Sequence, residues 1–298
     1  MTDQFHPDLR LARFLPRTIV WGWSLPLMRQ TDRLVGLLNR GAEVVQIGPD
    51  VSVRVRRPAG PPRGALLWIH GGGLLFGSSA QDDRACKRYS EELGLLVASV
   101  DYRLPPAHPY PAPLADCVLA LEWLLEQPDV PAGRVAVGGA SAGGGLAAAV
   151  ALTAKERGIP LLLQLLRYPM LDDRTILRTD VDGSRLRVWS PSANRLGWTS
   201  YLPGLAGGSE VPPLAAPARY LDLRGVAPAW IGVGTRDLFH DEDLEYARRL
   251  EEAGVPVTTT VVPGAYHGFD TLEVRAPVAR AFAAAELAAL REAFEGTG

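Results

Sequence analysis

The sequence predicts an α/β fold: a mostly parallel sheet with helices on both faces. Three observations predict it. From residue 43 onward, strand-like and helix-like segments alternate along the chain. Most of the strand-like runs are apolar at nearly every position, and a glycine-rich turn joins one of them to the helix that follows. Alternation of this kind is typical of parallel strands connected by crossover helices, which bury the strands from both sides.

The first two strands are expected to form a hairpin. EVVQI (43–47) and VSVRVR (51–56) flank the turn-forming residues Gly48, Pro49 and Asp50. The later strands are short apolar runs that suit buried positions. They are expected at 65–70, 95–100, 134–139, 161–166, 229–234 and 257–262.

The segments between these strands place apolar residues at helical spacing or are rich in small helix-forming residues. Helices are expected at 81–93, 113–126, 141–158, 241–253 and 277–294. Gly158 and Gly254 follow two of these helices at the position where glycine commonly forms a C-cap.

Two long stretches interrupt the alternation. Residues 1–40 precede the first strand, and residues 168–226 separate two strands by far more than an ordinary connection. In the second stretch Ser190 suits a helix N-cap and Pro191 the first helical position. Such an insertion is either a packing elaboration or a lid over a site. The predicted division is a catalytic domain (41–167 and 227–298) and a cap (1–40 and 168–226).

Composition and charge exclude several classes of protein. The chain has 298 residues, a net charge of −2 and no basic run of the kind that binds nucleic acid. Cys86 and Cys117 are interpreted as buried free thiols, because two cysteines are too few for a disulfide framework and no zinc-type spacing is present. We therefore predict no metal site and no nucleic-acid partner.

An apolar run near the N-terminus, TIVWGWSLPLM (18–28), follows several arginines and loosely resembles a signal peptide. It ends at Arg29 and Gln30 rather than at a small-residue cleavage site, and it is too short to span a bilayer. We interpret it as part of the folded protein and expect a cytoplasmic location without a membrane partner. An interfacial membrane anchor is the alternative.

The turn after the strand at 134–139 carries a candidate nucleophile. Gly139-Ala140-Ser141-Ala142-Gly143 fits the pattern G-x-S-x-G between a strand and a helix. Glycines on both sides of the serine permit the sharp turn that exposes its hydroxyl at the start of the helix. The alternative is a tight turn with a capping serine.

A serine hydroxyl needs a base, and the base needs an orienting carboxylate. Of the five histidines, His267 follows the last strand and is the best candidate for the base. Asp237 directly follows the strand at 229–234 and is interpreted as the acid, whereas Asp241 is interpreted as a helix N-cap.

The sequence LLWIHGGGLLFGSS (66–79) places three glycines after His70. Attack by Ser141 on a carbonyl group creates an oxyanion that needs preorganised donors. The amides of Gly71, Gly72 and Ala142 can supply them, because a glycine backbone can approach the substrate closely. We expect His70 to brace this loop by hydrogen bonds.

Taken together, these residues resemble the hormone-sensitive-lipase-like (bacterial family IV) carboxylesterases over about residues 64–270. The matching motifs are HGGGLLFGS (70–78), DYRLPPAHPYPAPLADC (101–117), GASAGGGLA (139–147), DLFHDE (237–242) and YHGF (266–269). The resemblance implies an α/β-hydrolase fold under a cap formed by the N-terminal segment and an insertion after the sixth strand. The order Ser141, Asp237, His267 is the one expected for that fold. Departures at Ala107, Ala140, Thr235 and Leu238 remove no triad residue.

The sequence therefore predicts a serine carboxylesterase for short- to medium-chain acyl esters, which acts through an acyl-enzyme without a cofactor and whose partner is a small ester. Predicted pocket walls are Phe76, Trp21, Trp23, Trp189, Trp198 and Tyr201, although core packing explains each aromatic about as well. A hydrolase of amides, lactones or carbamates is an alternative, and so is a non-catalytic ligand-binding homologue. A homodimer is possible.

Overall fold

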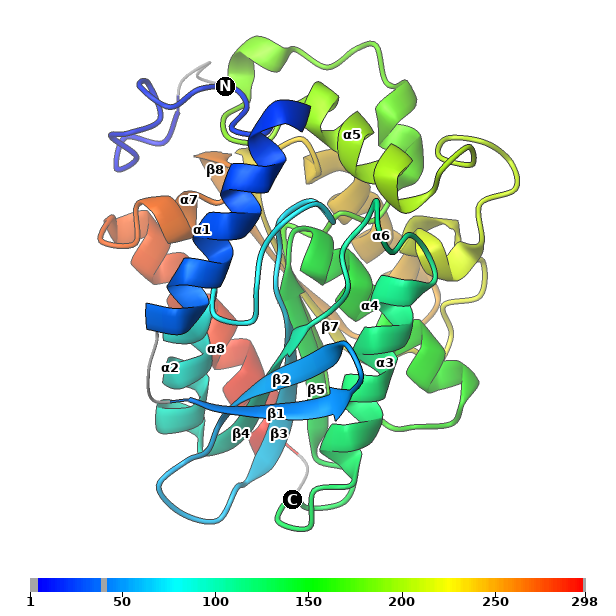
Figure 1. The fold of residues 1–298 in the computed structure, drawn as a ribbon. Coiled ribbons are helices and arrows are strands. Elements are labelled where there is room, and N and C mark those ends of the chain that lie inside the picture. The colour runs from blue at the N-terminus through cyan, green and yellow to red at the C-terminus, as the bar shows by residue number, and fades with distance from the viewer. Residues whose placement is uncertain (1–4, 39–41, 297–298) are drawn as a thin grey trace.

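A single eight-stranded sheet forms the centre of the computed structural model within residues 5–38 and 42–296, the residues that the structure describes (Figure 1). The strand order is β1-β2-β4-β3-β5-β6-β7-β8. β1 (Glu43–Gly48) pairs antiparallel with β2 (Val51–Arg56), and β2 pairs antiparallel with β4 (Leu95–Asp101). All other neighbours in the sheet are parallel. The predicted hairpin and the mostly parallel sheet are therefore confirmed.

The parallel part of the sheet brings the ends of distant segments to one edge. Its remaining strands are β3 (Gly64–Ile69), β5 (Val135–Ala140), β6 (Gln164–Arg167), β7 (Ala229–Arg236) and β8 (Val257–Tyr266). β6 begins three residues later than predicted, because 161–163 run beside β5 with irregular backbone before the ladder to β7 begins. The carboxyl ends of β3, β5, β7 and β8 each lead directly into a predicted site residue or loop.

Helices cover both faces of the sheet, as predicted. In Figure 1, α3 (Ala112–Leu125) and α4 (Ala142–Glu156) lie to the right of the sheet, and α2 (Asp83–Leu93) and α8 (Pro277–Glu295) lie to its left. α6 (His240–Glu252) shares the apolar cluster of α3 and α4. Successive side chains of β3 point to opposite faces of the sheet. Leu67 belongs to the apolar cluster formed with α3, α4 and α6, and Trp68 belongs to the apolar cluster formed with α2 and α8. This period of two is the geometry of an extended strand.

The two stretches outside the alternation contact each other. The first contains a short 3₁₀ turn, η1 (Gly22–Ser24), and a helix that was not predicted, α1 (Leu25–Leu38). Ile19 N donates to Val188 O at 3.1 Å, and Val188 N donates to Pro16 O at 3.0 Å. The predicted cap also includes residues 1–4 and 39–40, which lie outside the described residues.

The stretch between β6 and β7 contains short 3₁₀ segments and one longer helix, α5 (Pro191–Tyr201), which lies at the top of the molecule in Figure 1. The 3₁₀ segments are η2 (Asp173–Leu177), η3 (Gly183–Arg185), η4 (Pro213–Ala215) and η5 (Pro217–Arg219). Ser190 caps α5 by accepting a hydrogen bond from Ala193 N at 3.2 Å, and Pro191 occupies the first helical position. The predicted start of this helix is confirmed.

One further prediction concerns the interior. Cys86 and Cys117 are buried free thiols, as predicted. A short helix that was not predicted, α7 (Phe269–Leu272), follows the loop after β8. None of the helices in 5–38 and 42–296 is long and apolar enough to cross a bilayer.

Candidate active site

Ser141 lies in a strained turn between β5 and α4. Its backbone has φ 57° and ψ −122°, a conformation that costs roughly 1–3 kcal/mol in a residue other than glycine. The turn depends on glycine at two neighbouring positions. A Cβ at Gly139 would lie 2.3 Å from Gly143 O, and a Cβ at Gly143 would lie 2.1 Å from Ile69 O. The strand and helix can therefore approach closely enough to present the Ser141 side chain only because these side chains are absent.

The turn is held from β6 as well. Ser141 N donates to Arg167 O at 2.8 Å, and Ser141 O accepts a hydrogen bond from Met170 N at 3.0 Å. Both backbone polar groups of the strained residue are thus paired, and the elbow is fixed relative to the neighbouring strand.

Three side chains from three strand ends meet in one hydrogen-bonded line. The Ser141 Oγ and His267 Nε2 atoms are 3.0 Å apart, and the His267 Nδ1 and Asp237 Oδ2 atoms are 2.7 Å apart. The other carboxylate oxygen of Asp237 accepts a hydrogen bond from Phe239 N at 3.0 Å. All three triad side chains are largely buried. This geometry lets the imidazole accept the serine proton while the carboxylate holds the ring in one tautomer.

Asp241, the other acidic candidate near this position, lies elsewhere. It is in the first turn of α6 rather than at its N-cap, because the helix begins at His240. Its carboxylate pairs with Arg178 at 2.8 Å and with His240 at 2.9 Å. These hydrogen bonds lower the pKa of Asp241, that with His240 most of all, and keep the group on the surface. The prediction of Asp241 as the N-cap was wrong, because the N-cap residue is Phe239, two positions earlier. Of the two acidic candidates, Asp237 is the one that contacts His267.

Aromatic rings surround the His267 imidazole. Tyr168 meets it edge to face with ring centroids 4.7 Å apart, and Phe239 does so at 5.4 Å. The Trp189 ring lies 6.3 Å away. The imidazole is therefore packed into an apolar wall that limits its motion and its access to water.

The loop after β3 passes close to the nucleophile. A Cβ on Gly71 would lie 2.8 Å from Ala140 O, and a Cβ on Gly72 would lie 2.0 Å from Phe76 O. Gly72 also has φ 112°, which L side chains rarely adopt. Neither Gly71 N nor Gly72 N donates a hydrogen bond to any of the residues that the structure describes, and the same is true of Ala142 N at the start of α4. Three backbone donors near Ser141 are therefore available to a ligand.

His70 braces this loop, as expected from the sequence. Its Nδ1 atom lies 2.7 Å from Gly71 O, and its ring stacks on Tyr102 with centroids 4.3 Å apart. The Tyr102 hydroxyl in turn donates to His70 O at 3.0 Å. His70 is buried and turned toward the loop backbone, which places its ring away from proton transfer.

A cavity of about 200 Å³ adjoins Ser141 and His267. Its walls are mainly apolar and come from the loop after β3, from both irregular stretches and from α7. They include Ile19, Phe76, Tyr168, Val188, Trp189 and Leu272. The Trp189 indole lies over the third glycine of the loop, since a Cβ on Gly73 would be 1.9 Å from its ring.

Only two of the six predicted wall residues, Phe76 and Trp189, line this cavity. Trp21 and Trp23 stack on each other at 5.9 Å near the start of α1 and remain 44% and 78% exposed. Trp198 and Tyr201 lie on α5 and are buried in the apolar cluster that α3, α4 and α6 share. The four aromatics are outside the cavity because η1 turns the first pair outward and the inner face of α5 packs the second pair onto the body of the fold.

The family described as alpha/beta hydrolase fold matches residues 66–271 of the sequence. The chain belongs to this α/β-hydrolase family. Carboxylesterase NlhH of Mycobacterium tuberculosis is 33% identical over 281 residues, which cover 90% of this chain and 84% of that protein. Esterase LipI of the same species is 34% identical over 238 residues, which cover 78% and 73%. The solved structure of a bacterial heroin esterase superposes with a TM-score of 0.86 at 35% identity and covers 98% of both chains.

The predicted resemblance to the hormone-sensitive-lipase-like carboxylesterases and the α/β-hydrolase fold are thus confirmed. The enzyme class is confirmed with them, since these relatives are named esterases.

Several residues around the site of this α/β-hydrolase were missed from sequence. Tyr168 directly follows β6, so its place at a strand end was a usable signal. Ile19, Val188 and Leu272 carry no such signal, because ordinary apolar residues in loops or a short helix give no indication of what they face. Their positions depend on how the two irregular stretches pack together.

Several carboxyl groups on α6 and α8 have a raised pKa, among them Glu242 and Glu286. Burial raises the pKa of Glu242 to about 8, although its carboxylate accepts hydrogen bonds from Leu171 N at 2.7 Å and Asp172 N at 3.1 Å and also bonds to the Thr175 hydroxyl. Burial likewise raises the pKa of Glu286.

No group of three or more His, Cys, Asp or Glu side chains suited to a metal ion occurs in 5–38 and 42–296.

Proposed function

We propose that this protein is a serine carboxylesterase that hydrolyses short- to medium-chain acyl esters through an acyl-enzyme. One observation carries the proposal: His267 bridges Ser141 and Asp237 at 3.0 Å and 2.7 Å beside a small apolar cavity. The names of the relatives support ester substrates.

In the first half-reaction the Ser141 Oγ atom forms a bond to the ester carbonyl carbon. Its proton passes to His267 Nε2, and the carbonyl oxygen becomes an oxyanion. We assign the amides of Gly71, Gly72 and Ala142 as the donors to this oxyanion. The bond between the carbonyl carbon and the alkoxy oxygen then breaks. The leaving oxygen takes the proton from His267 and departs as the alcohol, which leaves an acyl group on Ser141.

In the second half-reaction a water molecule attacks the acyl carbon. His267 takes one water proton, and the same backbone donors stabilise the second oxyanion. The bond to Ser141 Oγ breaks, and Oγ takes the proton back from His267. The products are the carboxylic acid and the free enzyme, with no net change in the protonation of the triad. Asp237 stabilises the charged imidazole in both steps.

We further propose that residues 1–40 and 168–226 act as a cap over this site. The backbone hydrogen bonds of Val188 with Ile19 and Pro16 join the two stretches, and Ile19 and Val188 line the cavity. Trp189 from the same insertion packs over Gly73. A cap of this kind supplies apolar wall and excludes water from the acyl-enzyme.

The size of the cavity supports the proposed limit on acyl length. At about 200 Å³ it is smaller than the roughly 300–1,000 Å³ of pockets that hold drug-sized ligands. A short acyl chain fills such a space with its apolar surface covered. A long chain has to displace Trp189 or extend into solvent.

The test is hydrolysis of p-nitrophenyl esters from acetate to palmitate by wild type, Ser141→Ala and a control, Ser209→Ala, in an exposed serine. We expect activity to peak at short or medium chains and to fall about 10⁶-fold in Ser141→Ala but not in the control. Activity retained in Ser141→Ala would contradict the mechanism. A folded wild type that is inactive on every ester would favour the alternative substrates, which are amides, lactones and carbamates.

A further inference from the structure

A second cavity, of about 660 Å³, lies between α2, α7 and α8. The proposed ester hydrolysis makes no use of it. Its volume lies within the usual range for ligand pockets, roughly 300–1,000 Å³. Its walls are rich in charged side chains, unlike the apolar cavity beside Ser141.

The two cavities adjoin each other. Gln81, Asp82 and Thr271 contribute to the walls of both. Thr271 lies four residues after His267, which in the proposed mechanism protonates the leaving oxygen of the ester. The charged cavity therefore adjoins the cavity beside Ser141 and His267, where the ester bond breaks in the proposed mechanism.

The inner wall of the charged cavity offers hydrogen-bond acceptors. The buried Arg167 guanidinium donates to Glu286 at 2.8 Å and lies 3.3 Å from Asp270. Asp270 also accepts a hydrogen bond from the Tyr168 hydroxyl at 2.9 Å, and Asp82 accepts one from Trp68 Nε1 at 3.0 Å. A carboxylate can accept about four hydrogen bonds, so Asp82 and Asp270 keep acceptor capacity toward the cavity.

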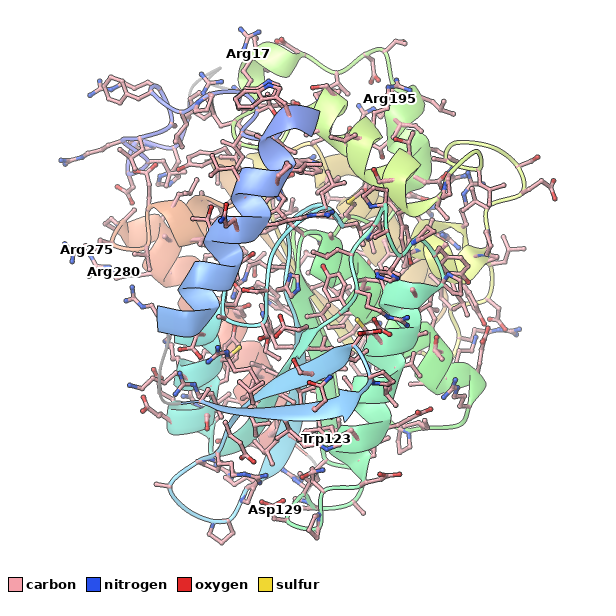
Figure 2. All side chains as sticks on the ribbon, in the orientation of Figure 1. Arg17, Trp123, Asp129, Arg195, Arg275 and Arg280 are labelled. Atoms are coloured by element: carbon pink, nitrogen blue, oxygen red, sulfur yellow. The ribbon has the colours of Figure 1, made fainter. Side chains whose placement is uncertain are left out.

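The outer wall offers donors. Arg84 and Arg280 are exposed and form no ion pair or side-chain hydrogen bond with the other residues that the structure describes. Figure 2 shows Arg280 reaching outward at the edge of the molecule, on the side of α8. Arg88 is instead paired with Glu92 at 2.8 Å. The outer wall thus carries two guanidinium groups that have no partner among the described residues.

The balance of charge decides which ligand class fits. The walls combine four arginines with four acidic residues: Arg84, Arg88, Arg167 and Arg280 with Asp82, Glu92, Asp270 and Glu286. An anionic ligand would meet the inner carboxylates, and a cationic ligand would meet the outer guanidiniums. A hydroxyl group both donates and accepts, so a neutral ligand with several hydroxyls can use both walls.

We propose that this cavity binds the alcohol part of the substrate when that alcohol carries several hydroxyl groups, as glycerol or a monosaccharide does. The inference rests on the proposed esterase function and specifies its substrate class: a small acyl group in the apolar cavity and a polyhydroxylated alcohol in the charged one.

The test compares two acetate esters of the same shape, 6-O-acetylglucose and cyclohexylmethyl acetate. Each carries a six-membered ring attached through CH₂–O to the acetyl group, but only the sugar has hydroxyls. We expect wild type to favour the sugar ester by at least about tenfold in kcat/KM, the effect of one or two retained hydrogen bonds. Equal values, or a preference for the cyclohexylmethyl ester, would overturn the proposal.

Filling the cavity provides the second arm. Ala283 lines it, whereas the next residue on α8, Ala284, is exposed and does not. Ala283→Trp is expected to reduce the preference for the sugar ester at least about fivefold, and Ala284→Trp to leave it unchanged. Arg280→Ala, a change at the surface, is expected to reduce the preference even if the tryptophan variant fails to fold. An unchanged preference in Arg280→Ala and in folded Ala283→Trp would refute the proposal.

These outcomes are separable from failure of the esterase proposal. Wild type is assayed in parallel on p-nitrophenyl acetate, whose aromatic leaving group needs no hydroxyl contacts. Activity on p-nitrophenyl acetate without preference for the sugar ester overturns only the role of the charged cavity. Inactivity of a folded wild type on all three esters overturns the proposed function.

Discussion

Replacing Gly71 by alanine tests the assigned oxyanion donors most directly. The position has an ordinary φ, so alanine causes no backbone strain of its own. Its Cβ would lie 2.8 Å from Ala140 O, which is closer than real Cβ atoms approach another atom. It would also lie 3.3 Å from Ser141 Cβ. Because Ala140 O belongs to the backbone of the elbow, the strain has to be relieved by moving the Gly71 amide away from Ser141.

The size of the effect follows from what that amide is proposed to do. Loss of one oxyanion donor costs about 10²–10³ in kcat, or roughly 2.7–4 kcal/mol of transition-state stabilisation. KM is expected to change little, because the full negative charge exists only in the transition state and the tetrahedral intermediate. A shift of a few tenths of an ångström in a loop is expected to lower the unfolding free energy by only about 1–2 kcal/mol.

The assay is steady-state hydrolysis of p-nitrophenyl acetate together with thermal melting. Gly60→Ala is the matched control, because a Cβ there meets no atom within 4 Å and its φ is also ordinary. A Gly71→Ala protein that melts near the wild-type temperature and keeps kcat within about twofold would refute the assignment of this amide. A similar loss in Gly60→Ala would show that the effect is not local to the site.

Three other predictions concern the triad, the cavity and stability. Asp237→Asn is expected to lower kcat by about 10⁴ with little change in KM, measured by the same assay, because the amide favours the wrong His267 tautomer. Trp189→Ala is expected to move the chain-length optimum of p-nitrophenyl esters to longer acyl groups. The control Trp23→Ala, at an exposed position, is expected to leave the optimum unchanged. Identical profiles for wild type and both variants would contradict the assignment of Trp189 to the cavity wall. Burial raises the pKa of Glu242 from 4.5 to about 8, so the folded state holds a proton that the unfolded chain releases. The unfolding free energy is therefore expected to fall as pH rises from about 4.5 to 8, and chemical denaturation of Glu242→Gln should show a smaller fall.

Much of the fold could be predicted from local pattern. The uniformly apolar runs gave the buried parallel strands, because a strand covered on both faces has no polar side. Glycine placement identified the sharp turns: Gly139 and Gly143 flank Ser141 where any side chain would strike backbone atoms. Boundaries were less certain where tertiary pairing determines them, as at β6, which starts later than the apolar run that predicts it.

The functions of individual aromatic residues could not be predicted in the same way. Trp23 and Trp189 are both tryptophans in irregular stretches, but one is 78% exposed and the other packs over Gly73. The difference depends on contacts between segments more than a hundred residues apart, including the hydrogen bonds of Val188 with Pro16 and Ile19. The spacing of apolar residues within either segment does not predict such contacts.

The sequence by itself determined the order of elements, the turns that require glycine and the identity of Ser141, Asp237 and His267 as candidates. These follow from the period of apolar residues and from the steric needs of single backbone positions, both of which are local. Only the tertiary structure decided which side chains face Ser141 and that a second, charged cavity adjoins the site. The Arg167 guanidinium of that cavity lies at the end of β6 and its partner Glu286 lies on α8, so their meeting depends on how helices pack on the sheet.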